Sequence, residues 1–256
     1  MKPDISEFSY GYALTSEIIQ TCGTSLAGAP LFPSLIQEGD LGYDLRLPIV
    51  GAPVFLQFKL SDHMVRSTAE GADKVPIPHY RMHLRPLKYS RQHNLLLALE
   101  RRGHRVFYAA PEFHRSSDLN RAYLKGEMIQ KTAFFRPHAI GHLDDSSHFV
   151  CFNAGSSHGF LCSEPISIER EAHLIVREAL TGNTAKPQER DLSARDYLQK
   201  VADELIADWA EITRASYEAK KMLEEIRRTR EPREYLNWVA QTLFDCVVLI
   251  RLRRKD

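Results

Sequence analysis

Asp44, Gln57 and Lys59 place a carboxylate, an amide and an amine in neighbouring parts of the sequence. We expect Asp44 on a strand within residues 42–47, and the other two on a strand within residues 54–60. Side chains alternate between the two faces of a strand, so Gln57 and Lys59 are expected to point the same way. The apolar residues of that strand are expected to point the opposite way, into a core: Val54, Leu56, Phe58 and Leu60. An acid, an amide and an amine so placed can hold a divalent cation and a water molecule against a phosphodiester.

The surrounding sequence predicts an alternation of helices and strands. Residues around Ser16–Gln20 are compatible with a helix that precedes both strands. After a polar insert, alternation predicts a further strand over Tyr80–Arg85. Ser90 and Gly103 then have the residue types that begin and end a helix. The apolar run Arg105–Pro111 predicts a buried strand, and this order of elements is typical of the α/β class.

The order helix, acid-bearing strand, QxK strand, helix and strand resembles the core of the PD-(D/E)XK nuclease superfamily. The closest variant is the Mrr-like one, in which Gln replaces the second acid. The resemblance covers residues 10–115 and implies a restriction-endonuclease-like fold, with a central mixed sheet flanked by helices. It also implies that Asp44 and Gln57 ligate Mg²⁺ or Mn²⁺, and that Lys59 orients the attacking water.

In this superfamily, the helix before the first strand often adds a glutamate to the metal site. Glu17 is therefore the expected third metal ligand and a catalytic residue. Glu7 and Glu38 are alternatives for this role. Each candidate also has a purely structural alternative, such as an exposed helix residue for Glu17 or a solubilising strand-edge residue for Lys59.

Composition and periodicity predict how the chain is organised. Hydrophobic residues make up 43% of the 256 residues and charged residues 26%, which is ordinary for a globular protein. A polar stretch at residues 181–191 lacks apolar periodicity and predicts a linker or long loop. It separates an α/β nuclease-like domain over residues 1–180 from an α-helical region over residues 192–256. Apolar residues at three- and four-residue steps predict a helical hairpin there, with a last helix over residues 234–250.

Basic residues gather near the helix expected over residues 90–103, although the net charge is only +1. Four residues of this region are candidates for contacts with nucleic-acid phosphates: Arg85, Lys88, Arg91 and His93. The alternative is a solvated helix face, with His93 packed between elements. No base-reading helix or aromatic stacking motif is identifiable in the sequence.

Cysteine usage and hydropathy favour a cytoplasmic protein. The four cysteines show no CxxC spacing, and no basic-then-apolar leader opens the chain, so reduced thiols are expected. No apolar run reaches the roughly 18 residues of a membrane-spanning helix, so a membrane partner is not expected.

Two other motifs lie between residues 142 and 162. Five residues could ligate zinc: His142, His148, Cys151, His158 and Cys162. However, His148 and Cys151 would face opposite sides of a strand that starts at His148. The segment Gly155–Gly159 matches the G-x-S-x-G nucleophile elbow of α/β-hydrolases. Too little sequence follows for the remaining strands and the acid and histidine of a triad, so we expect a hairpin turn.

The resemblance implies hydrolysis of phosphodiester bonds, with DNA favoured over RNA, in restriction or host defence. Cleavage of both strands by this fold generally needs two active sites, so a homodimer or a subunit of a multi-protein complex is expected. A competing class is a catalytically silent nuclease-fold subunit that binds nucleic acid or a partner protein through the helical C-terminal region. A third class is a zinc-stabilised interaction module.

Overall fold

Strand β1 (Val54–Phe58) lies in the interior of a mixed sheet. It runs parallel to β4 (Arg105–Pro111) and antiparallel to β9 (Val247–Leu249). Strand β5 (Thr132–Phe135) is antiparallel to β4 and gives the sheet the order β5-β4-β1-β9. A parallel pair requires a crossover connection, and the chain between β1 and β4 includes helix α3 (Gln92–Arg101). The predicted strand at 105–111 is confirmed, and the helix predicted between Ser90 and Gly103 is confirmed as α3.

The computed structural model describes most of the chain. The described residues are 1–22, 54–69, 71–89, 92–103, 105–164, 166–181, 194–244 and 247–249. The remaining helices are α1 (Glu7–Cys22), α4 (Ser116–Lys125), α5 (Pro137–Ile140), α6 (His173–Thr181), α7 (Ala194–Thr213), α8 (Tyr217–Thr229) and α9 (Pro232–Phe244). The chain therefore has an α/β fold, and its helices flank a mixed sheet and an antiparallel sheet.

A second sheet is antiparallel throughout. Its strands are β2 (Ser61–Met64), β3 (His79–Leu84), β6 (His148–Phe152), β7 (His158–Leu161) and β8 (Ile166–Glu169), in that order. The strand predicted over Tyr80–Arg85 is confirmed as β3, displaced by one residue. Met82 and Leu84 are buried, whereas His83 between them is exposed, as expected for a sheet with one face on the core.

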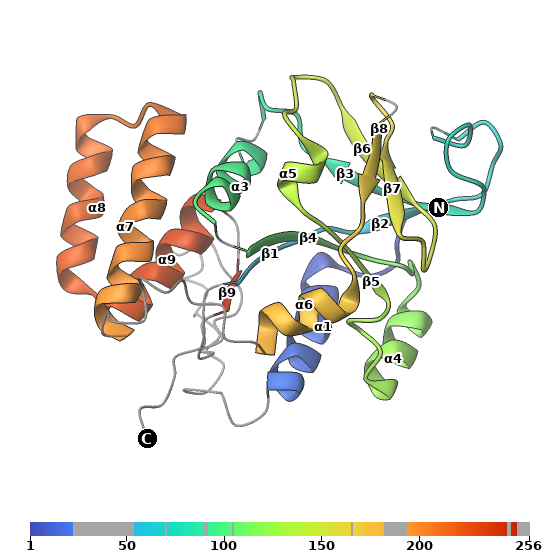
Figure 1. Ribbon diagram of the computed structural model, residues 1–256, viewed down its shortest axis with the longest axis horizontal. Helices are drawn as coiled ribbons and strands as arrows, with labels where there is room; N and C mark the ends of the chain where they lie inside the picture. Colours follow the sequence, from blue (N-terminus) through green and yellow to red (C-terminus); the bar gives the residue numbers. More distant parts are fainter. Residues whose placement is uncertain are drawn as a thin grey trace.

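The two faces of the mixed sheet pack in different cores. Figure 1 shows α1, α4 and α6 on one side of this sheet, and α3, α5 and the second sheet on the other. Leu56 and Phe107 pack in the core that includes residues of α1. Phe55 and Val106, one position earlier on each strand, pack in the core that α3 and the second sheet share. Strands buried on both faces need apolar residues at every position, so a polar residue inside β1 requires an explanation.

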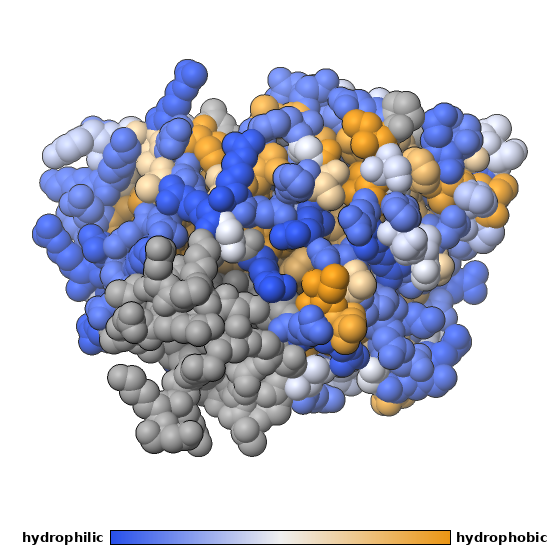
Figure 2. Space-filling model, viewed as in Figure 1, coloured by the Kyte–Doolittle hydropathy of each residue, from blue (hydrophilic) through white to orange (hydrophobic). Residues whose placement is uncertain are grey.

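The described part of the C-terminal region, residues 194–244 and 247–249, contains three helices and a strand. Residues of α7 and α9, such as Leu205 and Val239, belong to the same core as α3. Hydrophilic residues cover α7 and α8 on the face in Figure 2, which is the pattern of amphipathic helices with one buried side. The prediction of a helix over residues 234–250 is wrong at its end, because α9 stops at Phe244 and residues 247–249 pair with β1.

The domain division predicted at residues 181–191 falls almost wholly on residues 182–193, outside the described ranges, and stays a prediction. Within those ranges, no helix combines the length and apolar character that crossing a lipid bilayer requires.

Candidate functional site

Gln57, Lys59 and Gln92 form a hydrogen-bonded chain between the end of β1 and the start of α3. Lys59 Nζ donates to Gln92 Oε1 at 3.0 Å, and Gln92 Nε2 donates to Gln57 Oε1 at 2.7 Å. Gln57 Nε2 donates to the carbonyl of Phe58 at 3.1 Å. All three side chains are at most 8% exposed. We refer to these residues as the Gln57–Lys59–Gln92 cluster.

Strand geometry explains why two of these side chains meet the same partner. The Lys59 amide donates to the carbonyl of Ala109 at 3.0 Å, so the pairing of β1 with β4 continues past the end of β1. Gln57 and Lys59 are two positions apart and project from the same face. The apolar residues between and after them contact the core on the α1 side: Leu56, Phe58 and Leu60. Gln57 and Lys59 therefore lie on one face and these apolar residues on the other, as predicted, but Phe55 on the Gln57 face is buried in the second core, so that face is not polar throughout.

Burial makes the cluster energetically unusual. An ammonium and two amides next to an apolar core lose contact with water, and only their hydrogen bonds offset that loss. Replacing such buried polar groups by hydrocarbon is often neutral or stabilising, so stability alone gives little reason for a lysine at this position. In this contact the neutral amide oxygen of Gln92 accepts from the ammonium of Lys59.

Sequence reasoning missed Gln92. The residue begins α3, the predicted helix, but a polar residue in a first helical turn is ordinary and gives no signal of its own. Its role arises from the packing of α3 against the face of the mixed sheet that carries Gln57.

The expected acid of the site lies outside the described residues. Asp44 and its alternative Glu38 both fall in the undescribed range 23–53, so whether Asp44 reaches the cluster stays a prediction. Among the described residues, no three His, Cys, Asp or Glu side chains are grouped to hold a metal ion. The amide oxygen of Gln57 is of the kind that Mg²⁺ prefers and accepts one hydrogen bond from Gln92, so a second lone pair of that oxygen fits such a cation. A complete cation site depends on a carboxylate such as that of Asp44.

Glu17 does not join the cluster. Its carboxylate pairs with Arg177 Nη2 at 3.2 Å and accepts a hydrogen bond from the amide of Ile129 at 3.2 Å. Ile18, its neighbour on α1, packs in the same core as Leu56. Helix α1 therefore covers the face of the mixed sheet opposite to the cluster. The expectation that Glu17 ligates a cation beside Gln57 is corrected, because the sheet lies between them.

Of the four candidates for phosphate contact, Arg85 and Lys88 are exposed, and Arg91 lies outside the described residues. His93 is buried, and both ring nitrogens are engaged. Nε2 is 2.7 Å from the carbonyl of Gly141 and Nδ1 is 2.9 Å from the hydroxyl of Tyr108, so Nε2 donates and Nδ1 accepts.

Burial lowers the pKa of His93 to about 4, which keeps the ring neutral near pH 7. A buried ring whose two nitrogens are both bonded within the protein is not available to a phosphate. That prediction is wrong, and the alternative of a packed histidine holds.

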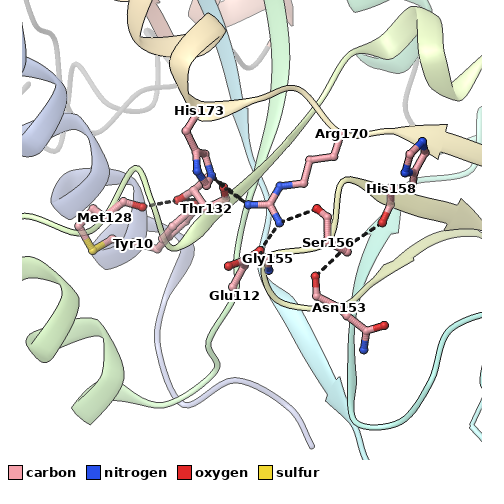
Figure 3. Close-up of polar contacts among 10 residues, drawn as sticks. All are labelled: Tyr10, Glu112, Met128, Thr132, Asn153, Gly155, Ser156, His158, Arg170 and His173. Atoms are coloured by element: carbon pink, nitrogen blue, oxygen red, sulfur yellow. Dashed lines mark hydrogen bonds and ion pairs between the residues drawn. The ribbon is translucent and has the colours of Figure 1, made fainter.

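A second buried polar group, which the sequence did not indicate, surrounds Arg170 (Figure 3). Its guanidinium pairs with the carboxylate of Glu112 and donates to the carbonyls of Ser156 at 3.3 Å and Thr132 at 3.1 Å. It also donates to Nε2 of His173 at 2.9 Å. Glu112 and Thr132 adjoin strands of the mixed sheet, and Ser156 lies in a turn of the second sheet. Arg170 therefore ties the two sheets together through protein groups.

The G-x-S-x-G segment forms the predicted hairpin turn. Strands β6 and β7 pair in antiparallel fashion on either side of it. Ser156 Oγ donates to the carbonyls of Asn153 and His158 within the turn, so the hydroxyl stabilises the turn itself. His148 bonds Asp144 and Ser163, whereas the neighbours of Cys151 lie at the opposite sheet face.

Comparison with family models, with curated proteins and with solved structures finds no match to this chain.

Proposed function

We propose that the protein is a metal-dependent nuclease with a restriction-endonuclease-like core, which hydrolyses phosphodiester bonds of DNA in preference to RNA. One observation carries the proposal. The Gln57 and Lys59 side chains, expected to act together, share one buried partner on one face of β1. An ammonium placed beside an amide oxygen in this way is a group that can act on a phosphate.

In this proposal, each residue of the cluster has a separate task. Lys59 holds the attacking water or the negative charge that develops on the phosphoryl group. Gln57 offers its amide oxygen to Mg²⁺ or Mn²⁺, and Asp44 offers the carboxylate. Gln92 is a positioning residue, because it bonds Gln57 and Lys59 and thereby sets the place of both. The cation, when bound, polarises the phosphoryl oxygen and lowers the pKa of its water.

The direct test is incubation of the purified protein with plasmid, single-stranded DNA and RNA, each with Mg²⁺, Mn²⁺ or EDTA. We expect cleavage that needs the metal and that disappears in Asp44→Ala and in Lys59→Met. Lys220→Met serves as the control, because Lys220 is exposed on α8. Hydrolysis that survives both Asp44→Ala and Lys59→Met removes the assignment.

A second candidate is a catalytically silent nuclease-fold subunit that binds nucleic acid or a partner protein. The engagement of Glu17 by Arg177 favours it, because this leaves the expected site with one acid fewer. Calorimetric titration of wild type and Asp44→Ala with Mn²⁺ separates the two. A nuclease requires a cation site that depends on Asp44, and a silent subunit does not.

Cleavage of both strands of a duplex would require two sites, as in a homodimer or a larger complex. Analytical ultracentrifugation with and without duplex DNA measures the oligomeric state. A protein that cuts both strands while remaining a monomer contradicts that part of the proposal.

A further inference from the structure

Basic side chains occupy alternate positions along the outer face of β3. Tyr80, Met82 and Leu84 contact the core between the two sheets. Arg81 and His83 lie between them and therefore project from the opposite face, away from that core. Arg85 continues the same spacing immediately after the strand and is exposed, as is His83.

An aromatic residue of the neighbouring strand completes this face. Phe149 of β6 pairs directly with His83 in the sheet register. The two ring centroids are 4.9 Å apart with an interplanar angle of 34°, and the Arg81 guanidinium lies 4.3 Å from the Phe149 centroid. Asp62 holds Arg81 through an ion pair of 3.0 Å. The guanidinium, phenyl and imidazole groups therefore form a row of planar groups held by cross-strand pairing.

A second aromatic residue lies in the segment that connects β3 to α3. Tyr89 is 76% exposed, and Lys88 Nζ lies 5.0 Å from the centroid of its ring. An exposed aromatic ring with cations beside it, on a strip that also carries His83 and Arg85, is the combination that binds single-stranded nucleic acid.

Electrostatics connect this strip to the Gln57–Lys59–Gln92 cluster. The pKa of His83 is lowered by partial burial and then by nearby positive charges, of which Lys59 acts most strongly. The other charges that lower it belong to Lys2, Arg81 and Arg85. Ser61 of β2, two residues after Lys59, pairs with Met82 of β3, so the end of the β1 segment lies beside the strand that carries the strip. The basic side chains of the strip complement a polyanion.

We propose that this strip, the β3 platform, binds an unpaired segment of nucleic acid beside the Gln57–Lys59–Gln92 cluster. The platform consists of Arg81, His83, Arg85, Lys88, Tyr89 and Phe149. Bases stack on the exposed rings of His83 and Tyr89, and Arg85 and Lys88 contact the phosphates. A duplex keeps its bases stacked inside, so this use of aromatic rings selects a single strand. The inference rests on the proposed function for the assignment of the bound strand as substrate.

The test measures binding without cleavage. A short fluorescein-labelled oligodeoxythymidine and a duplex of the same length are titrated with the full chain in EDTA, followed by fluorescence anisotropy. We expect the single strand to bind more tightly than the duplex. His83→Ala and Tyr89→Ala should each weaken single-strand binding about fivefold or more. Arg85→Gln with Lys88→Gln should also reduce the slope of log K against log salt by about 0.7 for each lost phosphate contact.

The chain provides matched controls on α8. Tyr217 is 77% exposed and Lys220 is exposed, so Tyr217→Ala and Lys220→Gln remove similar groups away from the platform and should leave affinity unchanged. The substituted platform residues His83, Arg85, Lys88 and Tyr89 are all exposed, so these variants should fold like wild type.

Three results overturn the inference: no binding of the oligonucleotide, tighter binding of the duplex, or unchanged affinity in both His83→Ala and Tyr89→Ala. A protein that binds through the platform but cleaves nothing contradicts the nuclease proposal alone. Metal-dependent cleavage combined with unchanged binding in the platform variants contradicts the platform alone.

Discussion

The side-chain amide of Gln92 donates a hydrogen bond of 2.7 Å to the side-chain oxygen of Gln57, across 35 positions of sequence. The same residue accepts from Lys59, so one side chain of α3 sets the position of two side chains from the β1 segment. A glutamine is suited to this place because its amide is a donor and an acceptor at once.

Gln92→Leu should lower the free energy of unfolding by about 1–3 kcal/mol, because it withdraws a hydrogen-bond partner from two buried polar groups. Urea unfolding followed by circular dichroism measures the change. If Gln92 positions catalytic groups, kcat should also fall while the affinity for oligonucleotide in EDTA stays the same. Gln130→Leu, at an exposed glutamine, is the control. Equal stability of the two variants would show that the bonds contribute nothing measurable.

Lys59→Met should reduce kcat by about 10²–10³ with little change in KM, because the ammonium is expected to act on charge that develops during the reaction. Methionine withdraws the donor from the buried amide oxygen of Gln92, so the free energy of unfolding should fall by about 1–3 kcal/mol and the thermal midpoint should fall with it. Kinetics on a single-stranded substrate measure the first effect and a thermal melt the second. A loss smaller than tenfold in a folded variant speaks against a catalytic Lys59.

Acidification should destabilise the protein partly through His93. Its pKa is about 4 in the folded state and near the ordinary value of 6.5 in the unfolded chain, so the unfolded chain takes up the proton first. The stabilisation that comes from keeping His93 neutral is therefore fully present above pH 6.5, and it is lost progressively as the pH falls toward 4. The difference corresponds to about 3 kcal/mol.

His93→Gln removes the titrating group, so the difference between the variant and wild type gives the contribution of His93 to the pH dependence of stability. The pKa values of His63, His83 and His114 are also lowered, but these residues are present in both proteins and their effects cancel. Urea unfolding between pH 7 and pH 4, a range set by the two pKa values, should give a shallower decline in the variant. Parallel pH profiles would show that His93 does not titrate in this range.

Arg170→Met should lower the free energy of unfolding by about 3–5 kcal/mol, because it leaves the Glu112 carboxylate, only 3% exposed, without its cation. Adding Glu112→Gln should restore much of the loss. The control is Arg195→Met, which breaks an ion pair whose partners are 70% and 68% exposed and should change stability by less than about 1 kcal/mol. Similar effects at the two sites would contradict the role of Arg170 as a tie between the sheets.

Local sequence patterns were sufficient to predict the strand and the helix that carry the Gln57–Lys59–Gln92 cluster. Alternation in the segment around Gln57 predicted that Leu56, Phe58 and Leu60 face a core, and alternation over residues 80–85 predicted the strand β3, because side chains change face at every position of a strand. The helix signals around residues 90–103 predicted α3, because the residue types at its ends satisfy or stop the backbone locally. The aromatic platform was missed, because His83 and Phe149 belong to strands that meet only in the sheet.

The amino-acid sequence by itself determined that Gln57 and Lys59 share a face, since two residues of one strand need no other element to align them. Only the tertiary structure decided that Glu17 lies across the sheet from them and that Gln92 lies beside them. Those outcomes depend on which face each helix covers, and burial of apolar area can drive a helix onto either side of a sheet. The pairing of β9 with β1 was decided in the same way, because a contact between strands so far apart in the sequence leaves no mark in local sequence.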